Sequence, residues 1–377
     1  MKCIKKAGVL GAGVMGATIA AHLANAGLDV LMLDIVPREL TEEEKKKGWT
    51  RESPQVRNRI AQEGLDGLLK MKPAPFLLQE YAQRIEVGNF QDHAHRLQEC
   101  DWIIEVVVEN MNIKKKLFSE TVAPNLREGA ILSTNTSGLS VNEMATALPP
   151  EVRKNFMVTH FFNPPRYMRL MEVVGCQEAD PAKVEFMADF INKRLGKGIV
   201  LAKDTPNFIG NRIGVYAIFK SIEHMMDIGM SVEEVDAVAG KATARPKSAA
   251  FRTADLVGLD TLVHVGHNSY QSLVDDEERE VFKLPDWVQK MVENNQLGNK
   301  TNQGFYKKEK TAEGTQILYW DYKAGEYKHS QKPKFESIKF AKMAKRHRRA
   351  AQSGDQRAGP GSRICLAQPA GHLALFL

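Results

Sequence analysis

A histidine and a glutamate twelve positions apart have the residue types best suited to proton-transfer chemistry. His160 lies in the run 158–162 and Glu172 lies in the run 170–174, both of which are apolar and strand-like. Two short strands joined by a turn would place these side chains next to each other. A carboxylate beside an imidazole favours the charged ring and determines which nitrogen carries the proton. The pair could therefore form a general base for a hydroxyl proton, or else a buried histidine that is satisfied by a structural partner.

A glycine-rich turn near the N-terminus has the setting of a dinucleotide-binding motif. The run 4–10 predicts a strand, the sequence Gly-Ala-Gly-Val-Met-Gly follows at 11–16, and apolar spacing over 14–25 predicts a helix. The run 28–33 predicts a second strand, which ends at Asp34. Strand, glycine turn, helix, strand and acid together indicate that this part of the chain binds a dinucleotide.

Each position of this motif has a physical reason. Gly11 allows the tight turn, Gly13 lets a pyrophosphate approach the backbone, and Gly16 lets the helix pack closely on the strand. The N-terminus of the helix attracts the phosphate charge. Asp34 would accept hydrogen bonds from the adenosine ribose and repel a 2′-phosphate, which predicts NAD rather than NADP as the cofactor.

Apolar runs farther along indicate a parallel sheet that is covered on both faces. The run 101–108 is almost continuously apolar, as a strand of such a sheet requires, and the run 130–133 predicts another strand. The polar stretch 134–138 follows at the place where ligands bind in doubly wound sheets, although Ser and Asn also cap ordinary loops. We therefore expect an α/β fold over residues 1–203, with a Rossmann-type doubly wound parallel sheet.

Residues 37–83 interrupt this pattern. They are rich in Lys, Glu, Arg and Gln and show helical spacing around 56–69, which predicts an inserted helical hairpin that stands off the sheet. Its cations could receive a polyanionic part of a substrate, or its charged face could simply be solvated, and the pattern leaves both interpretations open. The cations in question are Arg57, Arg59, Lys70 and Lys72.

A second domain follows, in which the strand signals stop. We predict an all-helical domain over residues 204–310, with helices near 207–229, 252–275 and 285–295. Broad apolar faces of this kind often pack against a second copy in cofactor enzymes, so a homodimer is expected.

Composition narrows the class of protein. The chain of 377 residues is 43% hydrophobic and 26% charged, as soluble globular proteins are. Its formal net charge of +6 suits an acidic small molecule. Nucleic acid is not expected as a partner, because much of the excess charge lies in the basic run 345–349. That run belongs to a C-terminal extension, residues 311–377, which we expect to be poorly ordered after about residue 344.

The spacing of the cysteines indicates whether they could bind a metal, and the hydropathy indicates whether the chain could cross a membrane. The four cysteines are scattered, with no pair at metal-ligand spacing, so no metal site is predicted. We expect reduced thiols and a cytoplasmic location. No uninterrupted stretch of about 18 apolar residues occurs, so no membrane span is expected.

Together these motifs resemble the 3-hydroxyacyl-CoA dehydrogenase family over roughly residues 5–306. The chain is most similar to the N-terminal dehydrogenase unit of the long bacterial β-oxidation proteins, in which an enoyl-CoA hydratase unit follows. The motifs that carry the resemblance are Gly-Ala-Gly-Val-Met-Gly at 11–16, the run 105–110, Ser-Thr-Asn-Thr-Ser at 133–137, His-Phe-Phe-Asn-Pro at 160–164, Glu-Val-Val at 172–174, Lys-Asp-Thr-Pro-Asn-Phe at 203–208, Asn-Arg at 211–212, Asp-Leu-Val-Gly-Leu-Asp at 255–260 and Gly-Phe-Tyr at 304–306.

The resemblance implies NAD-dependent oxidation of an L-3-hydroxyacyl-CoA to the 3-ketoacyl-CoA in fatty-acid β-oxidation. By this resemblance His160 takes the proton of the 3-hydroxyl group. Glu172 orients His160 and stabilises its charged form. Ser137 and Asn211 hydrogen-bond the substrate oxygen and hold it near His160.

Four further residues match positions of the family near the cofactor, namely Met15, Glu109, Lys114 and Asn163. The resemblance also implies an acyl-CoA as the substrate and a thiolase as a partner in β-oxidation.

One stretch departs from the family pattern. Family members usually carry a Pro-x-Gly-Pro-Phe type turn in the second domain, whereas residues 245–251 read Arg-Pro-Lys-Ser-Ala-Ala-Phe, which leaves the shape of the acyl site open. Two alternatives therefore stand beside the leading hypothesis: a short-chain 3-hydroxybutyryl-CoA dehydrogenase of the same fold, and a non-catalytic NAD-binding protein that resembles the lens crystallins of this fold. The joint presence of His160, Glu172, Ser137 and Asn211 argues against the second alternative.

Overall fold

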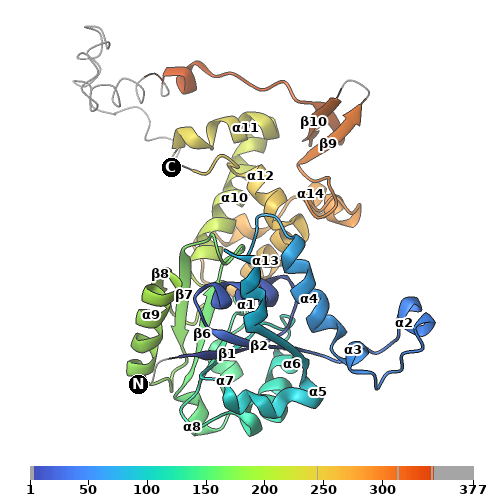
Figure 1. Ribbon diagram of the computed structural model, residues 1–377. Helices are drawn as coiled ribbons and strands as arrows, with labels where there is room; N and C mark the ends of the chain where they lie inside the picture. Colours follow the sequence, from blue (N-terminus) through green and yellow to red (C-terminus); the bar gives the residue numbers. More distant parts are fainter. Residues whose placement is uncertain (1–3, 244, 312–313, 341–342, 344–377) are drawn as a thin grey trace, which may run out of the picture. The chain divides into compact units, whose positions relative to one another are not determined.

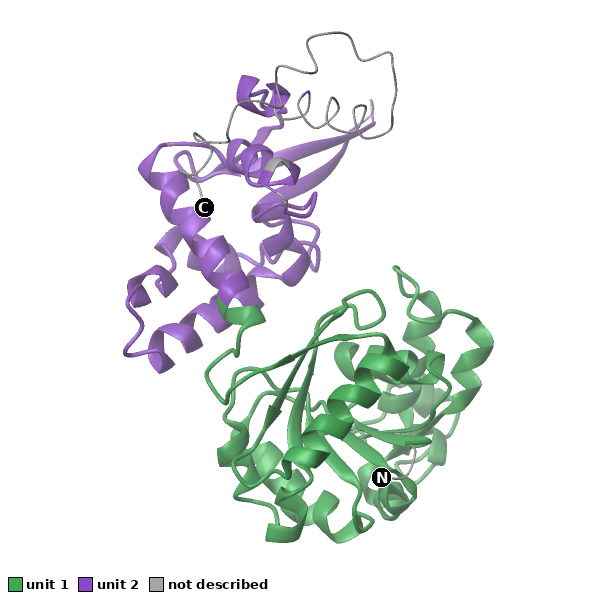
Figure 2. Ribbon diagram, turned by 90° about the vertical axis from the view of Figure 1, so that its left-hand side faces the viewer, with its two compact units in different colours: residues 1–212 green, residues 213–377 purple. Residues whose placement is uncertain are grey.

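The computed structural model describes residues 4–243, 245–311, 314–340 and 343. The chain divides into two compact units, residues 1–212 and 213–377 (Figure 2). The sequence pattern predicts the change of domain earlier, after residue 203. Our predictions for the basic run 345–349 and for the order of the chain beyond residue 344 lie outside the described residues.

The first unit alternates strands with helices (Figure 1). In chain order its elements are β1 (Lys6–Leu10), α1 (Val14–Asn25), β2 (Asp29–Asp34), α2 (Glu42–Lys46), α3 (Pro54–Arg57), α4 (Arg59–Lys70), η1 (Gln79–Arg84), β3 (Ile85–Asn89), α5 (Phe90–His93), η2 (Ala94–Glu99), β4 (Trp102–Glu105), α6 (Met111–Lys116), η3 (Leu117–Val122), η4 (Ala123–Asn125), β5 (Ile131–Thr134), α7 (Val141–Ala145), α8 (Pro150–Arg153), β6 (Phe156–Phe161), β7 (Leu170–Gly175), α9 (Pro181–Leu195), β8 (Gly198–Leu201) and α10 (Gly210–Asp227), which continues into the second unit.

The described strands of the first unit form one eight-stranded sheet, in the order β3-β2-β1-β4-β5-β6-β7-β8. Neighbouring strands are parallel, except that β6 and β7 pair antiparallel. This topology confirms the predicted Rossmann-type α/β fold. The edge strand β3 was not predicted from the sequence, because its five residues include Gly88 and are too few to show a clear alternation.

Two hydrophobic cores show that the sheet is covered on both faces. Successive side chains of a strand point to opposite faces, and on β4 Ile104 packs into one core while Ile103 packs into the other. The first core also contains Ile19 of α1 and Ile191 of α9, and the second core contains Met144 of α7. The almost continuous apolar character of the central strands follows from this burial on two sides.

The antiparallel pair β6–β7 brings the two candidate proton-transfer residues together. Both strands are rich in β-branched and other apolar residues, which favours extended structure. Their register sets His160 directly opposite Glu172. Opposite residues of an antiparallel pair have their Cβ atoms about 5 Å apart on the same face of the sheet. The predicted juxtaposition of these two side chains is therefore confirmed.

The inserted helical segment does not stand off the sheet as a whole, which corrects our prediction. Helix α4 packs against α1, β2 and β3. Its residues Ala61 and Leu68 are buried in the first core, because the apolar residues of the 56–69 pattern face α1. The short helices α2 and α3 extend outward from the unit (Figure 1).

Two glycines of α4 have different surroundings and provide a matched pair of variants. A Cβ at Gly64 would lie 2.5 Å from the carbonyl oxygen of Ala12, whereas a Cβ at Gly67 would meet no atom within 4 Å. We expect Gly67→Ala to raise the free energy of unfolding by up to about 1 kcal/mol, because alanine favours the helix. We expect Gly64→Ala to lower it by about 1–3 kcal/mol, because α4 must move away from Ala12. Urea denaturation measures both, and equal stabilisation by the two substitutions would contradict the close packing at Gly64.

The second unit is described by itself. Its elements after α10 are α11 (Val232–Val238), η5 (Lys241–Thr243), α12 (Phe251–Val257), α13 (Leu259–Ser272), η6 (Arg279–Phe282), α14 (Asp286–Glu293), β9 (Tyr306–Thr311), β10 (Gly314–Asp321) and β11 (Glu326–His329). None of the described helices is long and apolar enough to cross a membrane.

The helical part of the second unit agrees with the prediction, and a small sheet is added to it. The predicted helix over 252–275 is the pair α12 and α13, which separate at Gly258, where φ is +102°. Strands β9 to β11 form an antiparallel sheet in the order β11-β10-β9. Tyr306 of β9 and Tyr319 of β10 are buried in the core of this unit. The predicted domain over 204–310 is helical apart from the start of β9, and the rest of the sheet lies in the predicted extension 311–377. The sequence concealed this sheet because β9 is mostly charged.

Candidate active site

His160 and Glu172 form a buried hydrogen-bonded pair. Nδ1 of His160 lies 2.7 Å from Oε2 of Glu172, and the exposed fractions of the two residues are 6% and 0%. The ionised carboxylate accepts a hydrogen bond from Nδ1–H, so the proton of the neutral ring is on Nδ1 and the lone pair of Nε2 is available to a substrate. The rings of Phe162 and Phe208 have centroids 4.5 and 5.9 Å from that of the imidazole. These contacts hold the imidazole in one orientation.

The second carboxylate oxygen of Glu172 binds the start of α10. Oε1 accepts the N–H of Ile209 at 2.9 Å and the N–H of Gly210 at 2.7 Å. Burial by itself raises the pKa of Glu172, but the hydrogen bonds from His160 and from these backbone groups outweigh burial and lower the pKa below its ordinary value. Glu172 therefore stays ionised at neutral pH. The same contacts place Asn211, the second residue of α10.

The loop after β5 is tied to the strand of His160 and to the segment before α10. The side-chain oxygen of Asn135 accepts the N–H of Phe161 at 2.8 Å. The carbonyl oxygen of Ser137 accepts the N–H of Asn207 at 3.0 Å. These contacts hold the loop that carries Ser137 to the strand of His160 and to the segment that leads into α10.

A buried charged network supports this loop. The ammonium group of Lys114 lies 2.7 Å from Oε1 of Glu105 and 3.8 Å from Oε2 of Glu109. Oε1 of Glu109 accepts the hydroxyl of Thr136 and the N–H of Gly138. Burial raises the pKa of Glu109, but the charge of Lys114 and these hydrogen bonds outweigh burial and lower the pKa. Glu109 is therefore an ionised anchor for the loop after β5.

Glu105 and Thr134 belong to this network, although we did not predict either of them as a site residue from the sequence. Glu105 is fully buried, and its Oε2 accepts the hydroxyl of Thr134 at 2.6 Å. Burial raises the pKa of Glu105, while the ion pair with Lys114 opposes that rise. A signal was present in the sequence, because a glutamate inside the apolar run 101–108 must find a buried partner.

The glycine turn between β1 and α1 has the close contacts that the motif predicts. Gly11 has a φ of +109°, which favours glycine. A Cβ at Gly16 would lie 1.8 Å from the carbonyl oxygen of Gly11, so α1 approaches the turn this closely only with glycine there. A Cβ at Gly13 would meet no atom within 4 Å, and the space beside that residue is open to a ligand.

The first turn of α1 suits a phosphate group. Its N-cap is Gly13 and no side chain caps the helix, so the first backbone N–H groups and the positive end of the helix dipole are available to an anion. Asp34 ends β2 beside the turn, where its carboxylate accepts the N–H groups of Ala12 and Ile35. Each carboxylate oxygen keeps a second lone pair for a ribose hydroxyl. The residues present therefore fit a dinucleotide with a free 2′-hydroxyl.

Two predicted cofactor residues, Met15 and Asn163, have no side-chain hydrogen bond to another described residue. Met15 is the second residue of α1 and packs against the first core. Asn163 is exposed in the turn between β6 and β7. The geometry of the described residues assigns neither side chain a specific partner.

Two family models match the chain over most of its length. The 3-hydroxyacyl-CoA dehydrogenase NAD binding domain matches residues 6–205, and the 3-hydroxyacyl-CoA dehydrogenase C-terminal domain matches residues 208–308. The cofactor is NAD, in agreement with the carboxylate of Asp34 and the open space beside Gly13.

Related sequences cover most of the chain. A probable 3-hydroxyacyl-CoA dehydrogenase of Bacillus subtilis is 48% identical over 359 residues, which are 95% of this chain and 45% of that protein. A protein of Deinococcus radiodurans with the same description is 41% identical over 307 residues, which are 81% of this chain and 84% of that protein. The chain thus spans less than half the length of its Bacillus relative.

Solved structures agree with the sequence comparison. M. tuberculosis FadB2 superposes with a TM-score of 0.65 at 26% identity, covering 81% of this chain and 99% of that one. The (S)-3-hydroxybutyryl-CoA dehydrogenase PaaH1 of Ralstonia eutropha superposes with a TM-score of 0.61 at 27% identity, covering 80% and 98%. With its matched domains, its relatives and its fold in agreement, this chain belongs to the 3-hydroxyacyl-CoA dehydrogenase family.

Proposed function

We propose that this chain oxidises an L-3-hydroxyacyl-CoA to the 3-ketoacyl-CoA with NAD⁺, as a step of fatty-acid oxidation. The observation that carries the proposal is the buried contact of 2.7 Å between Nδ1 of His160 and Oε2 of Glu172. His160 lies at the carboxyl end of β6, and the glycine turn follows the carboxyl end of β1, so both lie at the same edge of the sheet. Ligands of doubly wound sheets bind at this edge.

The proposed reaction divides between the protein and its cofactor. NAD⁺ supplies the hydride acceptor for the hydrogen at C3. Nε2 of His160 takes the proton of the 3-hydroxyl group as the carbonyl forms, and Glu172 stabilises the resulting imidazolium. Ser137 and Asn211 hydrogen-bond the substrate oxygen and keep it within reach of Nε2.

Contacts with NAD are proposed for four residues by their match to the family. Glu109 and Lys114 border the loop after β5, Met15 lies in the first turn of α1, and Asn163 follows β6. All four come from the first unit.

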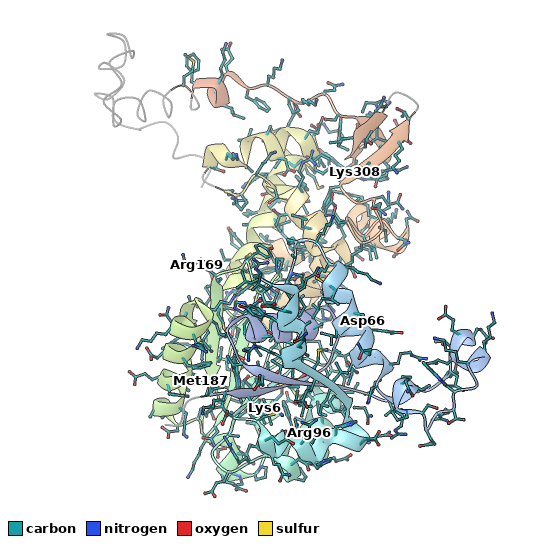
Figure 3. The ribbon with its side chains drawn as sticks, in the orientation of Figure 1. Lys6, Asp66, Arg96, Arg169, Met187 and Lys308 are labelled. Atoms are coloured by element: carbon teal, nitrogen blue, oxygen red, sulfur yellow. The ribbon has the colours of Figure 1, made fainter. Side chains whose placement is uncertain are left out.

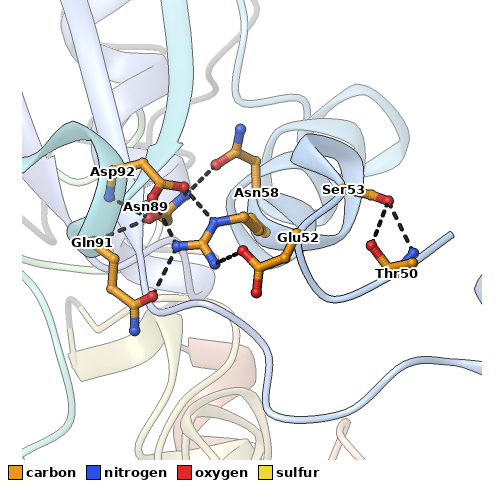
Figure 4. Close-up of polar contacts among 8 residues, drawn as sticks. Thr50, Glu52, Ser53, Asn58, Asn89, Gln91 and Asp92 are labelled. Carbon is orange, nitrogen blue, oxygen red and sulfur yellow. Dashed lines mark hydrogen bonds and ion pairs between the residues drawn. The ribbon is translucent and has the colours of Figure 1, made fainter.

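The ion pairs of the inserted segment reduce the number of cations that could receive the phosphates of CoA. Arg57 donates two hydrogen bonds to the carboxylate of Asp92 and lies 3.3 Å from Glu52. Figure 4 labels these two carboxylates, Asp92 and Glu52. Arg59 is paired with Glu44. Because two-pronged pairs of this kind are strong, Arg57 is an unsuitable phosphate ligand, and the pairing of Arg59 argues the same way.

Lys70 and Lys72 are therefore the cations of this segment that we propose for CoA. Both are exposed, and neither forms an ion pair with another described residue. Lys70 is the last residue of α4, the helix that packs against α1 and the sheet.

The test is to mix the purified chain with NADH and with acetoacetyl-CoA or a longer 3-ketoacyl-CoA. The absorbance of NADH reports how fast the 3-ketoacyl-CoA is reduced. Turnover that depends on NADH would support the proposal. Binding of NADH without turnover of any 3-ketoacyl-CoA would show that the protein only binds the dinucleotide, and the proposed oxidation would be wrong.

A short-chain 3-hydroxybutyryl-CoA dehydrogenase is the second candidate, and the structural similarity to PaaH1 favours it. The two candidates differ in how kcat/KM depends on acyl length. A steep fall from acetoacetyl-CoA to longer 3-ketoacyl-CoAs would select the short-chain enzyme, and a flat or rising profile would select the general one.

We also propose that this chain forms a homodimer and works with a thiolase. Exposed apolar residues of the second unit, such as Ile228 at 57% and Val274 at 62%, would suit a homodimer. A thiolase that consumes the 3-ketoacyl-CoA is the expected functional partner. Light scattering of the purified chain measures its molar mass and so tests for the homodimer. Co-purification with a thiolase tests for the functional partner.

Asp34 is expected to determine the preference for NADH over NADPH. Asp34→Asn removes the charge and keeps an acceptor for the N–H of Ala12. We expect the KM for NADH to rise about tenfold and the KM for NADPH to fall, because hydrogen bonds to a charged acceptor are lost together with the repulsion of a 2′-phosphate. Asp29→Asn, at the opposite end of β2, is the matched control and should change neither value. Equal effects of the two substitutions would argue against the role of Asp34.

A further inference from the structure

A cavity within the second unit has no role in the oxidation proposed above. Its volume is about 770 Å³, which is the size of a small-molecule site. All of its lining residues belong to the second unit. One wall comes from the stretch 245–251, which departs from the family pattern and contributes Lys247.

Three cations line this cavity, namely Lys247, Arg252 and Lys308. Figure 3 shows Lys308 on β9. In the part of the chain that the structure describes, none of the three is joined to a carboxylate by an ion pair. Cations grouped around one cavity repel each other, and a bound anion would relieve that repulsion.

Arg252 is held in place before any ligand arrives. Its guanidinium carbon lies 3.9 Å from the centroid of the Tyr306 ring, and its backbone N–H donates to Asp236. The hydroxyl of Tyr306 donates to the same carboxylate at 3.0 Å. A guanidinium stacked on a ring keeps the N–H groups at its edge for a phosphate.

Asp255 also lines the cavity, and its carboxylate accepts hydrogen bonds from backbone N–H groups. Oδ1 of Asp255 accepts the N–H of Phe305 at 2.8 Å, and Oδ2 accepts the N–H of Tyr306 at 2.9 Å. Burial raises the pKa of Asp255 to about 7, although these hydrogen bonds oppose the rise. Asp255 therefore offsets only part of the positive charge of the cavity.

The rest of the wall is partly apolar. Leu256 is 61% exposed, and Ile317 of β10 lies on the same cavity. The side-chain amides of Asn299 and Asn302 add hydrogen-bond donors. Cations, amides and an apolar wall together suit a ligand that has a phosphate group and an organic body.

We propose that this cavity binds an organic phosphate or pyrophosphate. Lys247, Arg252 and Lys308 hold the phosphate groups, and Leu256 and Ile317 contact the organic part. A free nucleotide and the 3′-phospho-ADP part of CoA both offer this chemistry, and the experiment below distinguishes them.

The experiment is calorimetric titration of the full chain with ADP, 3′,5′-ADP and CoA, once with NAD⁺ to fill the glycine turn and once without it. The double variant Lys247→Gln/Lys308→Gln should bind ADP and 3′,5′-ADP about tenfold more weakly, since two charge-assisted contacts are lost. It should keep only the CoA binding that depends on Lys70 and Lys72. Tighter binding of 3′,5′-ADP and CoA than of ADP would identify CoA as the source, and equal binding would identify a nucleotide.

Two controls keep the proposal open to refutation. Lys290→Gln/Lys310→Gln makes the same change in net charge in the same unit, outside the cavity lining, and should bind like the wild type. Lys70→Gln/Lys72→Gln removes the cations proposed for CoA in the first unit and should keep the binding of ADP. The proposal is overturned if the wild type binds none of the ligands, if both second-unit double variants bind alike, or if only the Lys70/Lys72 variant loses ADP binding.

Discussion

His160→Gln is expected to remove most turnover and to leave the binding of NADH intact. Glutamine keeps a polar side chain of similar reach, but it cannot exchange a proton at neutral pH. The kcat for acetoacetyl-CoA should therefore fall on the order of 10²- to 10⁴-fold. The dissociation constant of NADH should change little, because the glycine turn lies between β1 and α1 and does not contain this residue. Steady-state kinetics and a fluorescence titration with NADH measure the two quantities.

His224→Gln is the matched control for this variant. The side chain of His224 is 61% exposed in the second unit, and its replacement should leave kcat unchanged. Turnover of His160→Gln within a few-fold of the wild type would show that another group exchanges the proton, and the assignment of His160 as the base would be wrong.

Glu172→Gln is expected to have the next largest effect, through the position and the proton of His160. A glutamine can offer its amide N–H to Nδ1, which would hold the imidazole in the wrong tautomer. The kcat should fall on the order of 10²- to 10⁴-fold, the range seen when a buried carboxylate partner of a catalytic histidine is neutralised. The KM for the acyl-CoA should also rise, because Glu172 holds Gly210 and thereby Asn211.

The same substitution makes a prediction for stability against pH. The pKa of Glu172 in the folded protein lies below its ordinary value of 4.5, so this carboxylate contributes stability that is present above about pH 4.5 and is lost as the pH falls through the lowered value. At neutral pH Glu172→Gln should lower the free energy of unfolding by roughly 1.5–3 kcal/mol, which is the contribution of a hydrogen bond to a charged group. The deficit should shrink in acid.

Urea denaturation at neutral and acid pH measures this difference. Glu151→Gln is the control, since Glu151 is exposed in the short helix α8 and its replacement should leave stability unchanged at either pH. A deficit of Glu172→Gln that is constant with pH would show that the ionised carboxylate is not what stabilises the fold.

The sequence by itself determined the class of fold and the dinucleotide turn. Both depend on local patterns, because the conformational freedom of glycine at 11–16 and the acid at Asp34 act within one strand–turn–helix–strand segment. The run 101–108 is apolar along its length because a sheet covered on both faces buries successive side chains on opposite sides. Two strand-like runs around His160 and Glu172 likewise follow from residue types alone.

Only the tertiary structure decided which charged groups meet. A shift of one residue in the pairing of β6 and β7 would move Glu172 to the other face of the sheet, and no local pattern excludes that shift. The burial of Glu105 against Lys114 and the pairing of Arg57 with Asp92 also join segments that the sequence pattern treats separately. The charges themselves can be read from the sequence, but their partners depend on contacts between distant residues, which exist only once the strands and helices have packed.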